Sequence, residues 1–457
     1  MTGPRQRIAR PGLAALVLAF AVALLVVAAA VAGDRTDSSF GENGVVRLPP
    51  PPEARALGVG PVVFDLAQDG EGRIVAALSD YTGQGGYIAA ARFRPDGALD
   101  TGFGDGGFAE AVGVDDGVVT GLVSGEAQGI AVQSDGKIVV AGYQLGRDKA
   151  APALVRFRDD GSLDPAFGEG GTVAPRPRGV GDEALHAVVV QPGGRIVAVG
   201  GKHEHQGGPP AGLVVAYRPD GSVDRGFGQG GRLLFPAPEG RKEYTGFKAV
   251  RRAPGGKLLV AGYSRGRLIV VRLTATGALD RSFGGDGRVV LDIGENRGCV
   301  GDCDLKTSLA VQPGNRILVA ADRALEAPKL VRLRGDGSLD RSFGRGGFVP
   351  LAGRLFKAKD LALDRHGRIV VAGIGERFRS RRDVTIVFKV LRLLPGGSLD
   401  RSFGRAGAQT LPIGEASAAF AALTQASGRV VVGGGAQLAG GRNRNRLLLT
   451  RYLAAGR

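Results

Sequence analysis

Residues that could support catalysis are few and scattered in this sequence. Ser264 lies in GYSRG at residues 262–266, which matches the G-x-S-x-G string of serine hydrolases. That string positions a nucleophile only in a strand, sharp turn and helix context. Here the serine ends an apolar β-like run, and His186 and His366 lie beside strands or turns without a paired nucleophile. We therefore expect no catalytic residue and no cofactor.

One histidine pair has the residue type that a metal site needs. His203 and His205 are separated by a single glutamate in GKHEHQGG, a stretch that we expect to be a loop. A protein metal site usually needs three or four convergent ligands, and an isolated i, i+2 pair does not supply them. No metal site is predicted, and these histidines are only weak candidates.

The two cysteines of the chain lie close together. Cys299 and Cys303 occur in GCVGDCD. In an exported protein such a pair predicts a local disulfide. The alternative is a metal site that includes Asp302 or Asp304, which would require more ligands than the stretch contains.

Arginines form two clusters in stretches that we expect to be loops of neighbouring repeats. Guanidinium groups form paired hydrogen bonds with phosphate and carboxylate groups, so adjacent loops of this kind could make one anion-binding patch. Two separate solvated loops are the alternative. The predicted polyanion-binding residues are Arg377, Arg379, Arg381, Arg382, Arg442, Arg444 and Arg446.

A repeat of roughly 60 residues organises the chain that must position these side chains. A Phe-Gly pair, as in LDRSFGRGG at 339–347, occurs at a spacing between 56 and 64 residues. A fixed period of this size indicates a repeat architecture. The pairs begin at Phe40, Phe103, Phe167, Phe227, Phe283, Phe343 and Phe403.

The local pattern within each repeat is that of β-strands. Runs such as KIVVAG at 137–142 are short, apolar and rich in branched residues, and glycine-containing turns bound them. Each repeat reads as four strands, A to D, such as GIAVQ, KIVVAG, LVRFR and GTVAP. Four-stranded sheets repeated radially make a β-propeller. The predicted fold is all-β, a propeller with seven four-stranded blades.

The chain ends predict how the ring closes. The first Phe-Gly pair is followed by one strand, GVVRL at 44–48, and the chain stops after an apolar run at 447–453 where a D strand is missing. We therefore expect residues 34–457 to form a single propeller, whose last blade is shared by residues 36–48 and 416–457. Its N-terminal D strand would pair with the C-terminal A to C strands.

The repeated aspartate and phenylalanine are interpreted as folding residues. Phenylalanine fills the space between sheets, and aspartate can hold its turn by accepting hydrogen bonds from its own backbone. Calcium binding at each PDGSLD is the alternative, but the spaced oxygen ligands of an EF-type loop are absent. The structural residues are Asp100, Phe103, Asp164, Phe167, Asp224, Phe227, Asp280, Phe283, Asp340, Phe343, Asp400 and Phe403.

These elements together resemble the delta-60 repeat family of bacterial β-propellers. The resemblance rests on the SLDxSFGxGG-like and QPDGKIVVAG-like segments and covers nearly the whole chain from Asp34 to Arg457. It implies a propeller that is often extracytoplasmic. It implies no established activity and transfers no catalytic residue.

The N-terminus is predicted to be a signal peptide, residues 1–32. A basic segment, RQRIAR, precedes an uncharged apolar run at 13–32 that ends in AVA. The run is also long enough to be a membrane anchor, which is the alternative. Because the first repeat motif begins at Asp37, a retained helix would hold the ring against the bilayer without a linker. We therefore expect cleavage after Ala32, no membrane contact afterwards, and a monomer that is secreted or on the cell surface.

Composition limits the choice of partner. The net charge is +16, and losing Arg5, Arg7 and Arg10 with the leader leaves +13, a balance that favours polyanions. Export disfavours nucleic acid, and the chain has no Trp and few Tyr for the aromatic stacking platforms that bases favour. A surface that is basic only through an arginine-rich composition is the alternative.

The connections between strands differ in a way that indicates the working face. The A-to-B turns and the Phe-Gly connections are uniform, whereas the B-to-C and D-to-A stretches vary in length and composition. Variable loops on a rigid scaffold are where binding usually occurs. The sequence thus predicts a secreted, non-catalytic propeller that binds a protein or an anionic cell-surface polymer through these loops. An extracytoplasmic propeller enzyme, such as a hydrolase, lyase or dehydrogenase, is the alternative, as is a surface protein that binds polyanions or cell wall.

Overall fold

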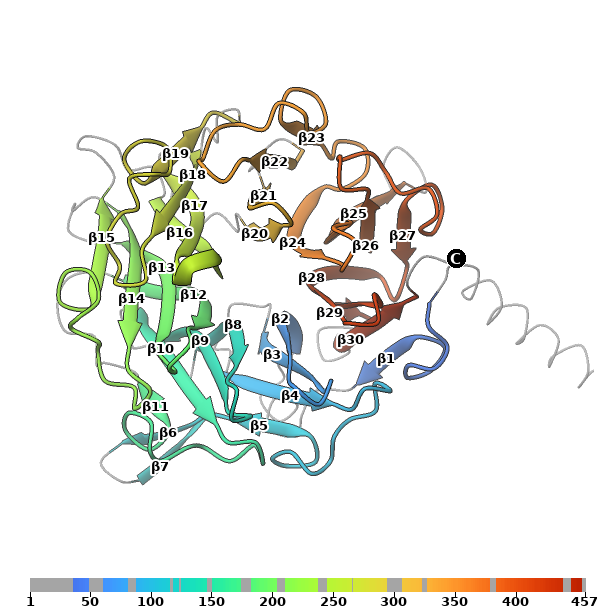
Figure 1. Cartoon of the computed structure of the whole chain (residues 1–457). Coiled ribbons are helices and arrows are strands. Elements are labelled where there is room, and N and C mark those ends of the chain that lie inside the picture. Colours follow the sequence, from blue (N-terminus) through green and yellow to red (C-terminus); the bar gives the residue numbers. More distant parts are fainter. Residues whose placement is uncertain are drawn as a thin grey trace, which may run out of the picture.

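The computed structural model contains seven four-stranded antiparallel sheets arranged around one axis (Figure 1). It describes residues 36–48, 61–80, 88–115, 118–122, 125–145, 150–173, 182–203, 210–236, 245–264, 266–293, 306–322, 327–378, 384–438 and 445–453. The predicted all-β, seven-bladed propeller is confirmed. Within the described ranges, no helix is long and apolar enough to cross a membrane. The predicted signal peptide, residues 1–32, lies outside them.

The first three blades follow the chain order from the axis outward. Blade 1 holds β2 (Pro61–Gln68), β3 (Ile74–Asp80), β4 (Ala89–Phe93) and β5 (Phe108–Glu110). Blade 2 holds β8 (Gly125–Val132), β9 (Ile138–Leu145), β10 (Ala150–Phe157) and β11 (Thr172–Val173). Blade 3 holds β12 (Asp182–Val190), β13 (Ile196–His203), β14 (Ala211–Tyr217) and β15 (Arg232–Pro236). A two-stranded hairpin, β6 (Val112–Asp115) and β7 (Val118–Leu122), lies between blades 1 and 2 in the chain.

The next three blades repeat this arrangement. Blade 4 holds β16 (Thr245–Arg252), β17 (Leu258–Ser264), β18 (Arg267–Leu273) and β19 (Arg288–Leu291), with a 3-10 turn, η1 (Pro254–Gly256), before β17. Blade 5 holds β20 (Thr307–Gln312), β21 (Arg316–Ala321), β22 (Lys329–Leu333) and β23 (Phe348–Pro350). Blade 6 holds β24 (Lys357–Leu363), β25 (Ile369–Phe378), β26 (Val384–Leu393) and β27 (Ala408–Leu411).

Blade 7 takes strands from both ends of the chain. It holds β28 (Ala416–Thr424), β29 (Val430–Gln437), β30 (Asn445–Tyr452) and, as its outer strand, β1 (Val45–Leu48). β1 runs antiparallel to β30, with Val45 opposite Thr450 and Leu48 opposite Leu447. The backbone N–H of Arg451 also donates to the carbonyl of Gly44 at 2.9 Å.

Apolar faces of adjacent sheets pack together to form the core. Between blades 1 and 2, for example, Val75, Ala77, Val140 and Phe157 form one buried cluster with Phe103. The alternating pattern of the strands places such residues on both faces of each sheet, because every blade is covered on two sides.

A three-residue clasp recurs around the ring, and in six of the seven blades its arginine donates to a backbone carbonyl of the next blade. In blade 5, Arg332 Nε donates to Asp340 Oδ2 at 2.8 Å, and its Nη1 donates to the carbonyl of Pro395 in blade 6 at 2.6 Å. Its guanidinium lies 4.5 Å from the ring centroid of the fully buried Phe343. The same arginine, aspartate and phenylalanine set recurs as Arg92/Asp100/Phe103, Arg156/Asp164/Phe167, Arg272/Asp280/Phe283, Arg392/Asp400/Phe403 and Arg451/Asp37/Phe40.

Blade 3 lacks the strand arginine and compensates from another position. Ala216 occupies the place of Arg332 in β14. Arg195, which precedes β13, instead donates to Asp224 Oδ2 at 2.6 Å and to the carbonyl of Ala275 in blade 4 at 2.9 Å. The clasp is therefore preserved although the residue that supplies the cation has changed.

The glycine of the Phe-Gly pair is required by a close backbone approach. Gly104 has a φ of 55°, and its N–H donates to the carbonyl of Asp160 in the next blade at 2.7 Å. A Cβ at this position would lie 1.9 Å from the carbonyl oxygen of Phe108. Glycine thus permits the turn into the D strand and a second link between blades.

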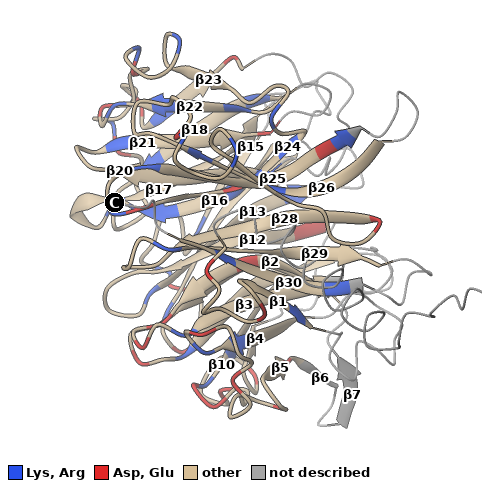
Figure 2. Cartoon of the chain, turned by 90° about the vertical axis from the view of Figure 1, so that its right-hand side faces the viewer, with Lys and Arg blue, Asp and Glu red and all other residues tan. Residues whose placement is uncertain are grey.

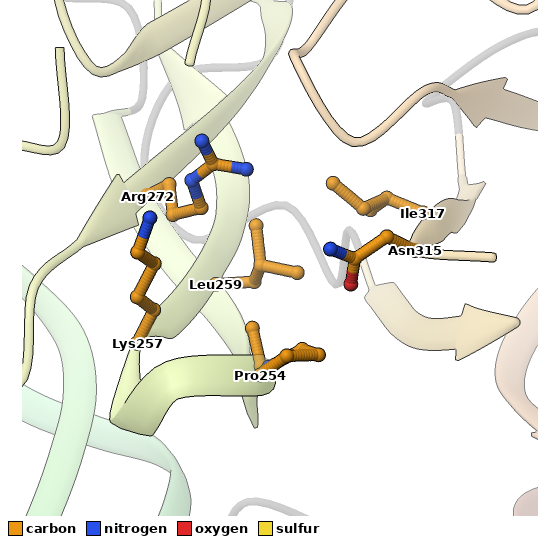
Figure 3. A pocket seen from close by; sticks show the side chains of 7 residues that line it. Pro254, Lys257, Leu259, Arg272, Asn315 and Ile317 are labelled. Carbon is orange, nitrogen blue, oxygen red and sulfur yellow. The ribbon is translucent and has the colours of Figure 1, made fainter. Parts of the chain in front are cut away.

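A small pocket between blades 4 and 5 lies where a glutamine hydrogen bond, found between other neighbouring blades, is missing. Gln191 and Gln312 each donate an amide hydrogen bond to a turn carbonyl of the following blade, at Gly256 and Gly367. Blade 4 has Ala253 at the equivalent position. The pocket, of about 50 Å³, is lined by Ala253, Pro254, Lys257, Leu259, Arg272, Asn315 and Ile317 (Figure 3).

We expect Ala253→Gln to raise the free energy of unfolding by about 1 kcal/mol, because the amide would fill this pocket and donate to the Asn315 carbonyl. Ala253→Met is the matched control, since it fills the space without supplying a donor. Urea denaturation of both variants measures the difference. A glutamine variant no more stable than the methionine variant would show that no hydrogen bond forms.

Candidate functional site

The two faces of the ring differ as expected from the order of the strands. The A-to-B turns lie on one face, at the left edge of Figure 2, where basic and acidic residues are interspersed. The ends of the B and D strands and the starts of the A and C strands lie on the opposite face, which we call the variable face. The end of β25 and the start of β30 reach the variable face from blades 6 and 7.

The structure places only part of the predicted arginine patch. Arg377 is exposed near the end of β25, and Arg446 is half-buried at the start of β30. The other five lie outside the described residues, so the patch stays a prediction. Cys299, Cys303 and His205 also lie outside them, and for His203 only the backbone is described. No group of three or more His, Cys, Asp or Glu that could hold a metal occurs in the described part of the chain.

The candidate catalytic residues of the sequence are not brought together. Ser264 ends β17 in blade 4, and His366 is exposed in the turn before β25, where Arg365 Nε donates to its ring at 3.1 Å. His186, in contrast, is buried in β12 near the axis, with 6 % of its surface exposed. His186 belongs to a group of residues around the axis of the ring.

Seven residues, one from each blade, approach the axis from the innermost strands, and we call them the axial cluster. Six of them are the extra residue of a β-bulge, which the register of the A and B strands skips. A bulge leaves its residue unpaired and redirects the side chain. Blade 5 has no bulge and contributes the residue that precedes β20. The cluster is Phe64, Gln128, His186, Lys248, Lys306, Lys359 and Phe420.

Lys306 crosses the axis from blade 5. Its Nζ donates to Oε1 of Gln128 in blade 2 at 3.0 Å and lies 5.4 Å from the ring centroid of Phe64 in blade 1. Phe64 in turn stacks on Phe420 of blade 7, with centroids 5.5 Å apart and an interplanar angle of 17°. Lys359 Nζ lies 5.9 Å from the Phe420 centroid. Side chains from five blades therefore meet at the centre of the ring.

Blades 3 and 4 complete the cluster with a pair of nitrogen groups. Lys248 Nζ and His186 Nε2 are 3.1 Å apart, and only 8 % and 6 % of the two residues is exposed. The ammonium group of Lys248 can donate to the imidazole in its neutral form. Lys359 is buried even further, with 3 % exposed. Three lysines from consecutive blades, Lys248, Lys306 and Lys359, are thus buried or half-buried within the axial cluster.

Two aspartates lie one residue further along the A strands. Asp65 Oδ2 accepts the backbone N–H of Ile130 in blade 2 at 2.9 Å, and Asp360 Oδ2 accepts that of Ala422 in blade 7 at 2.8 Å. Both carboxylates tie one inner strand to the next. Desolvation, with a further contribution from the charge of Asp360, raises the pKa of Asp65 to about 6, while Arg251 acts in the opposite direction.

The raised pKa of Asp65 predicts that the free energy of unfolding decreases as pH rises. The folded state keeps the proton between about pH 4 and pH 6, where the unfolded chain has released it, so the free energy of unfolding falls across this window. The loss should reach about 2–3 kcal/mol by pH 7, and Asp65→Asn should be free of it. Urea unfolding of both proteins from pH 4 to pH 7 tests this, and parallel pH profiles would contradict it.

The axial cluster was not predicted from the sequence, although a signal exists. When the seven A strands are aligned on their turns, the bulge position reads Phe64, Gln128, His186, Lys248, Thr307, Lys359 and Phe420. Most neighbouring positions are small or apolar. A position that varies in polarity within an otherwise regular strand indicates a side chain without a common packing role. Chemically, three ammonium groups beside an amide and an imidazole are suited to binding an anion.

Comparison with protein families identifies the repeats. Six segments match a family described as "Domain of unknown function (DUF5122) beta-propeller", at residues 72–103, 133–167, 191–227, 254–283, 312–343 and 367–403. Each segment runs from an A-to-B turn to the phenylalanine of the Phe-Gly pair. This supports the repeat family at the level of a β-propeller of unknown function, and the delta-60 name stays a prediction. None of the curated proteins matches the sequence.

Among solved structures, similar chains are found at low sequence identity. A protein of unknown function from Dyadobacter fermentans is 10% identical, with coverage of 92% of this chain and 99% of that one and a TM-score of 0.46. The polysaccharide lyase Uly1 is 8% identical, with 86% and 90% covered and a TM-score of 0.46. An aldose sugar dehydrogenase from Streptomyces coelicolor is 14% identical, with 75% and 96% covered and a TM-score of 0.41. Likenesses of this size carry no argument about activity.

Proposed function

Because this chain carries six repeats of the DUF5122 β-propeller family, a domain of unknown function, we propose from its own geometry that it is an extracytoplasmic binding protein without catalytic activity. Its partner is an anionic cell-surface polymer or an acidic protein, received on the variable face with the axial cluster at the centre. The observation that carries this proposal is that consecutive blades contribute Lys248, Lys306 and Lys359 to one cluster at the axis.

The scaffold supports a binding role because it holds this site rigidly. In six of the seven blades the clasp arginine bonds to the next blade, and Asp360 joins the inner strand of blade 6 to that of blade 7, as Asp65 joins those of blades 1 and 2. A preorganised site loses little conformational entropy when a ligand binds. The net charge of +16 attracts anions over a longer range and favours the same class of partner.

The proposed location follows from the sequence of the N-terminus. The basic segment and apolar run of residues 1–32 favour export, and export is consistent with a disulfide between Cys299 and Cys303. In that compartment anionic wall polymers and acidic headgroups are abundant, so a basic axial site would meet suitable ligands.

The test is retention of the purified chain from residue 33 onward on the wall fraction of its own cells, across a salt series. We expect salt-sensitive retention that falls at least tenfold in the triple variant Lys248→Met, Lys306→Met, Lys359→Met. The control variant Arg94→Gln, Arg158→Gln, Arg218→Gln removes the same charge from the opposite face and should be retained like wild type. Equal loss in both variants would show that only net charge matters.

The predicted arginine patch can be tested in the same assay. A variant with Arg377, Arg379, Arg381, Arg382, Arg442, Arg444 and Arg446 changed to Gln should weaken retention if the loops extend the site outward. Retention unchanged in this variant, but lost in the lysine variant, would confine binding to the axis. No retention of wild type would refute the proposal.

An extracytoplasmic enzyme is the second candidate, and one observation favours it. A buried carboxyl group with a raised pKa often marks a catalytic site, and Asp65 lies one residue beyond the axial cluster, which also holds His186 and Lys248. Release of soluble fragments from the wall fraction by wild type, abolished by Lys248→Met, would favour the enzyme. A wall fraction that binds the protein and stays intact would favour the binding protein.

A further inference from the structure

The lysines of the axial cluster are reached only by a group that enters the ring. Lys248 and Lys359 expose 8 % and 3 % of their surface, and Lys306 is half-buried. An anionic polymer that lies across the variable face would contact loop residues instead. A ligand that meets these amines must therefore present a projecting group small enough to pass along the axis.

The depth to which such a group can enter is limited by two features. Lys306 spans the axis between blade 5 and blades 1 and 2, where it contacts Gln128 and Phe64. One residue further along the A strands lie the carboxyl groups of Asp65 and Asp360. An ionised carboxylate repels an anion, so an entering anion is stopped at the level of the lysines.

The wall of the site is divided between polar and apolar sides. The stacked pair of Phe64 and Phe420 forms one side, with centroids 5.5 Å apart, and His186 with Lys248 forms another. Apolar contact with the phenylalanines favours a carbon skeleton behind the anionic group, while the lysine amines supply the charged contacts. This arrangement suits the end of a polymer chain, because the rest of the chain extends from it in one direction only. A group inside a chain does not fit, because the polymer continues on both sides of it.

From this geometry, and resting on the proposed function, we propose that the axial cluster binds a single terminal carboxylate or phosphate monoester, inserted end-on along the propeller axis, with Lys248, Lys306 and Lys359 as its charged contacts. The terminal group of an anionic wall polymer, or a free organic acid or phosphate monoester, shares this chemistry. The site thus selects chain ends, and the length of a polymer contributes only through the surrounding loops.

The test is calorimetric titration of the chain from residue 33 onward, which contains every described residue of the ring. Propionate and methyl phosphate are the end-group probes. Dimethyl phosphate, which carries the same single charge as propionate but has substituents on both sides, represents a group inside a chain. We expect at least one end-group probe to bind at least tenfold more tightly than dimethyl phosphate, and Lys306→Met to weaken that binding at least tenfold.

Controls separate the specific result from general charge effects. Arg94, whose side chain is 59% exposed on the opposite face, should be replaceable by Gln without effect on the titration. Lys306→Met is preferred to changes at the two buried lysines, because methionine has a similar length and keeps contact with Phe64. Unchanged circular dichroism and thermal midpoint show that this variant is folded, and Lys306→Gln serves in its place if it is not.

The outcomes distinguish this inference from the proposed function. Binding of propionate or methyl phosphate that depends on Lys306, together with displacement of the protein from the wall fraction by the same probe, supports a polymer chain end as the ligand. The same binding without displacement supports a free small acid or phosphate monoester. Equal affinity for dimethyl phosphate, or no binding of any probe while wall retention still depends on the lysines, overturns the end-on site and leaves the proposed function standing.

Discussion

Deletion of residues 36–48 from the full-length chain is expected to abolish the monomeric folded state. The deletion removes the outer strand of blade 7, which pairs with β30, and also Phe40, which is fully buried between blades 7 and 1. Loss of a buried phenylalanine alone costs about 3–5 kcal/mol. Typical domains have a total stability of about 5–15 kcal/mol.

Two further consequences make this deletion more damaging than the loss of an ordinary edge strand. Arg451, which is 3 % exposed, would lose Asp37 as the acceptor of its clasp, leaving a buried cation without its carboxylate. The newly exposed edge of β30 would also offer unpaired backbone groups to other chains. We therefore expect aggregates or oligomers in place of a monomer.

Size-exclusion chromatography with light scattering and circular dichroism measure the outcome. A shorter deletion within residues 49–60, which leaves β1 and β2 intact, is the control and should retain more of the fold. A soluble monomer with wild-type thermal stability after deletion of residues 36–48 would disprove the structural role of β1.

The second large effect is expected at the clasp of blade 5. We expect Asp340→Ala to lower the free energy of unfolding by about 3–5 kcal/mol, because it leaves the guanidinium of Arg332 buried without its carboxylate. Arg332 and Asp340 are 5 % and 3 % exposed. Asp340 also holds its turn, since Oδ1 accepts from the hydroxyl of Ser342 at 2.6 Å.

A matched control lies four residues away in the same connection. Asp336 accepts hydrogen bonds from the backbone and hydroxyl of Ser338, as Asp340 does from Ser342, but it is exposed and forms no clasp. Asp336→Ala should therefore lower stability by about 1 kcal/mol or less. If both variants lose the same amount by urea denaturation, the turn and not the buried ion pair determines stability.

A double variant separates the charge effect from the packing effect. Arg332→Met with Asp340→Ala removes both charges, keeps apolar contact with Phe343, and should be more stable than Asp340→Ala alone. The hydrogen bond from Ser342, together with Arg332, holds the pKa of Asp340 below its usual value. This group therefore contributes stability that is present above about pH 4 and is lost as pH falls, and the double variant should lack that acid sensitivity.

The repeat pattern of the sequence was sufficient to predict the fold. Seven Phe-Gly pairs at nearly constant spacing, with seven sets of three β-like runs of which the last follows the final pair, indicate seven similar four-stranded sheets. Local turn chemistry also predicted that an aspartate such as Asp340 accepts hydrogen bonds from the residue two positions later, because that interaction lies within one turn. These features depend on residues close in the sequence, so the sequence displays them directly.

The arginine that pairs with the repeated aspartate was not predicted from the sequence, although its distance from the aspartate in the sequence is regular. In five blades an arginine lies eight residues before it, as Arg332 does before Asp340, but an arginine in a strand is usually read as a solvent-facing residue. Only the packing of blade 5 against blade 6 shows that this side chain is buried and reaches the carbonyl of Pro395. The exchange to Arg195 in blade 3 likewise depends on geometry that spacing does not reveal.

The candidate site was decided by tertiary structure alone. Lys306 and Gln128 are 178 residues apart, yet closure of the ring places them 3.0 Å from each other across the axis. Each residue of the axial cluster is unremarkable within its own strand, because a bulge position accepts almost any side chain. The sequence determined the strands, their turns and their number. Which seven side chains face one another depended on how bulges and blade packing orient strands about a common axis.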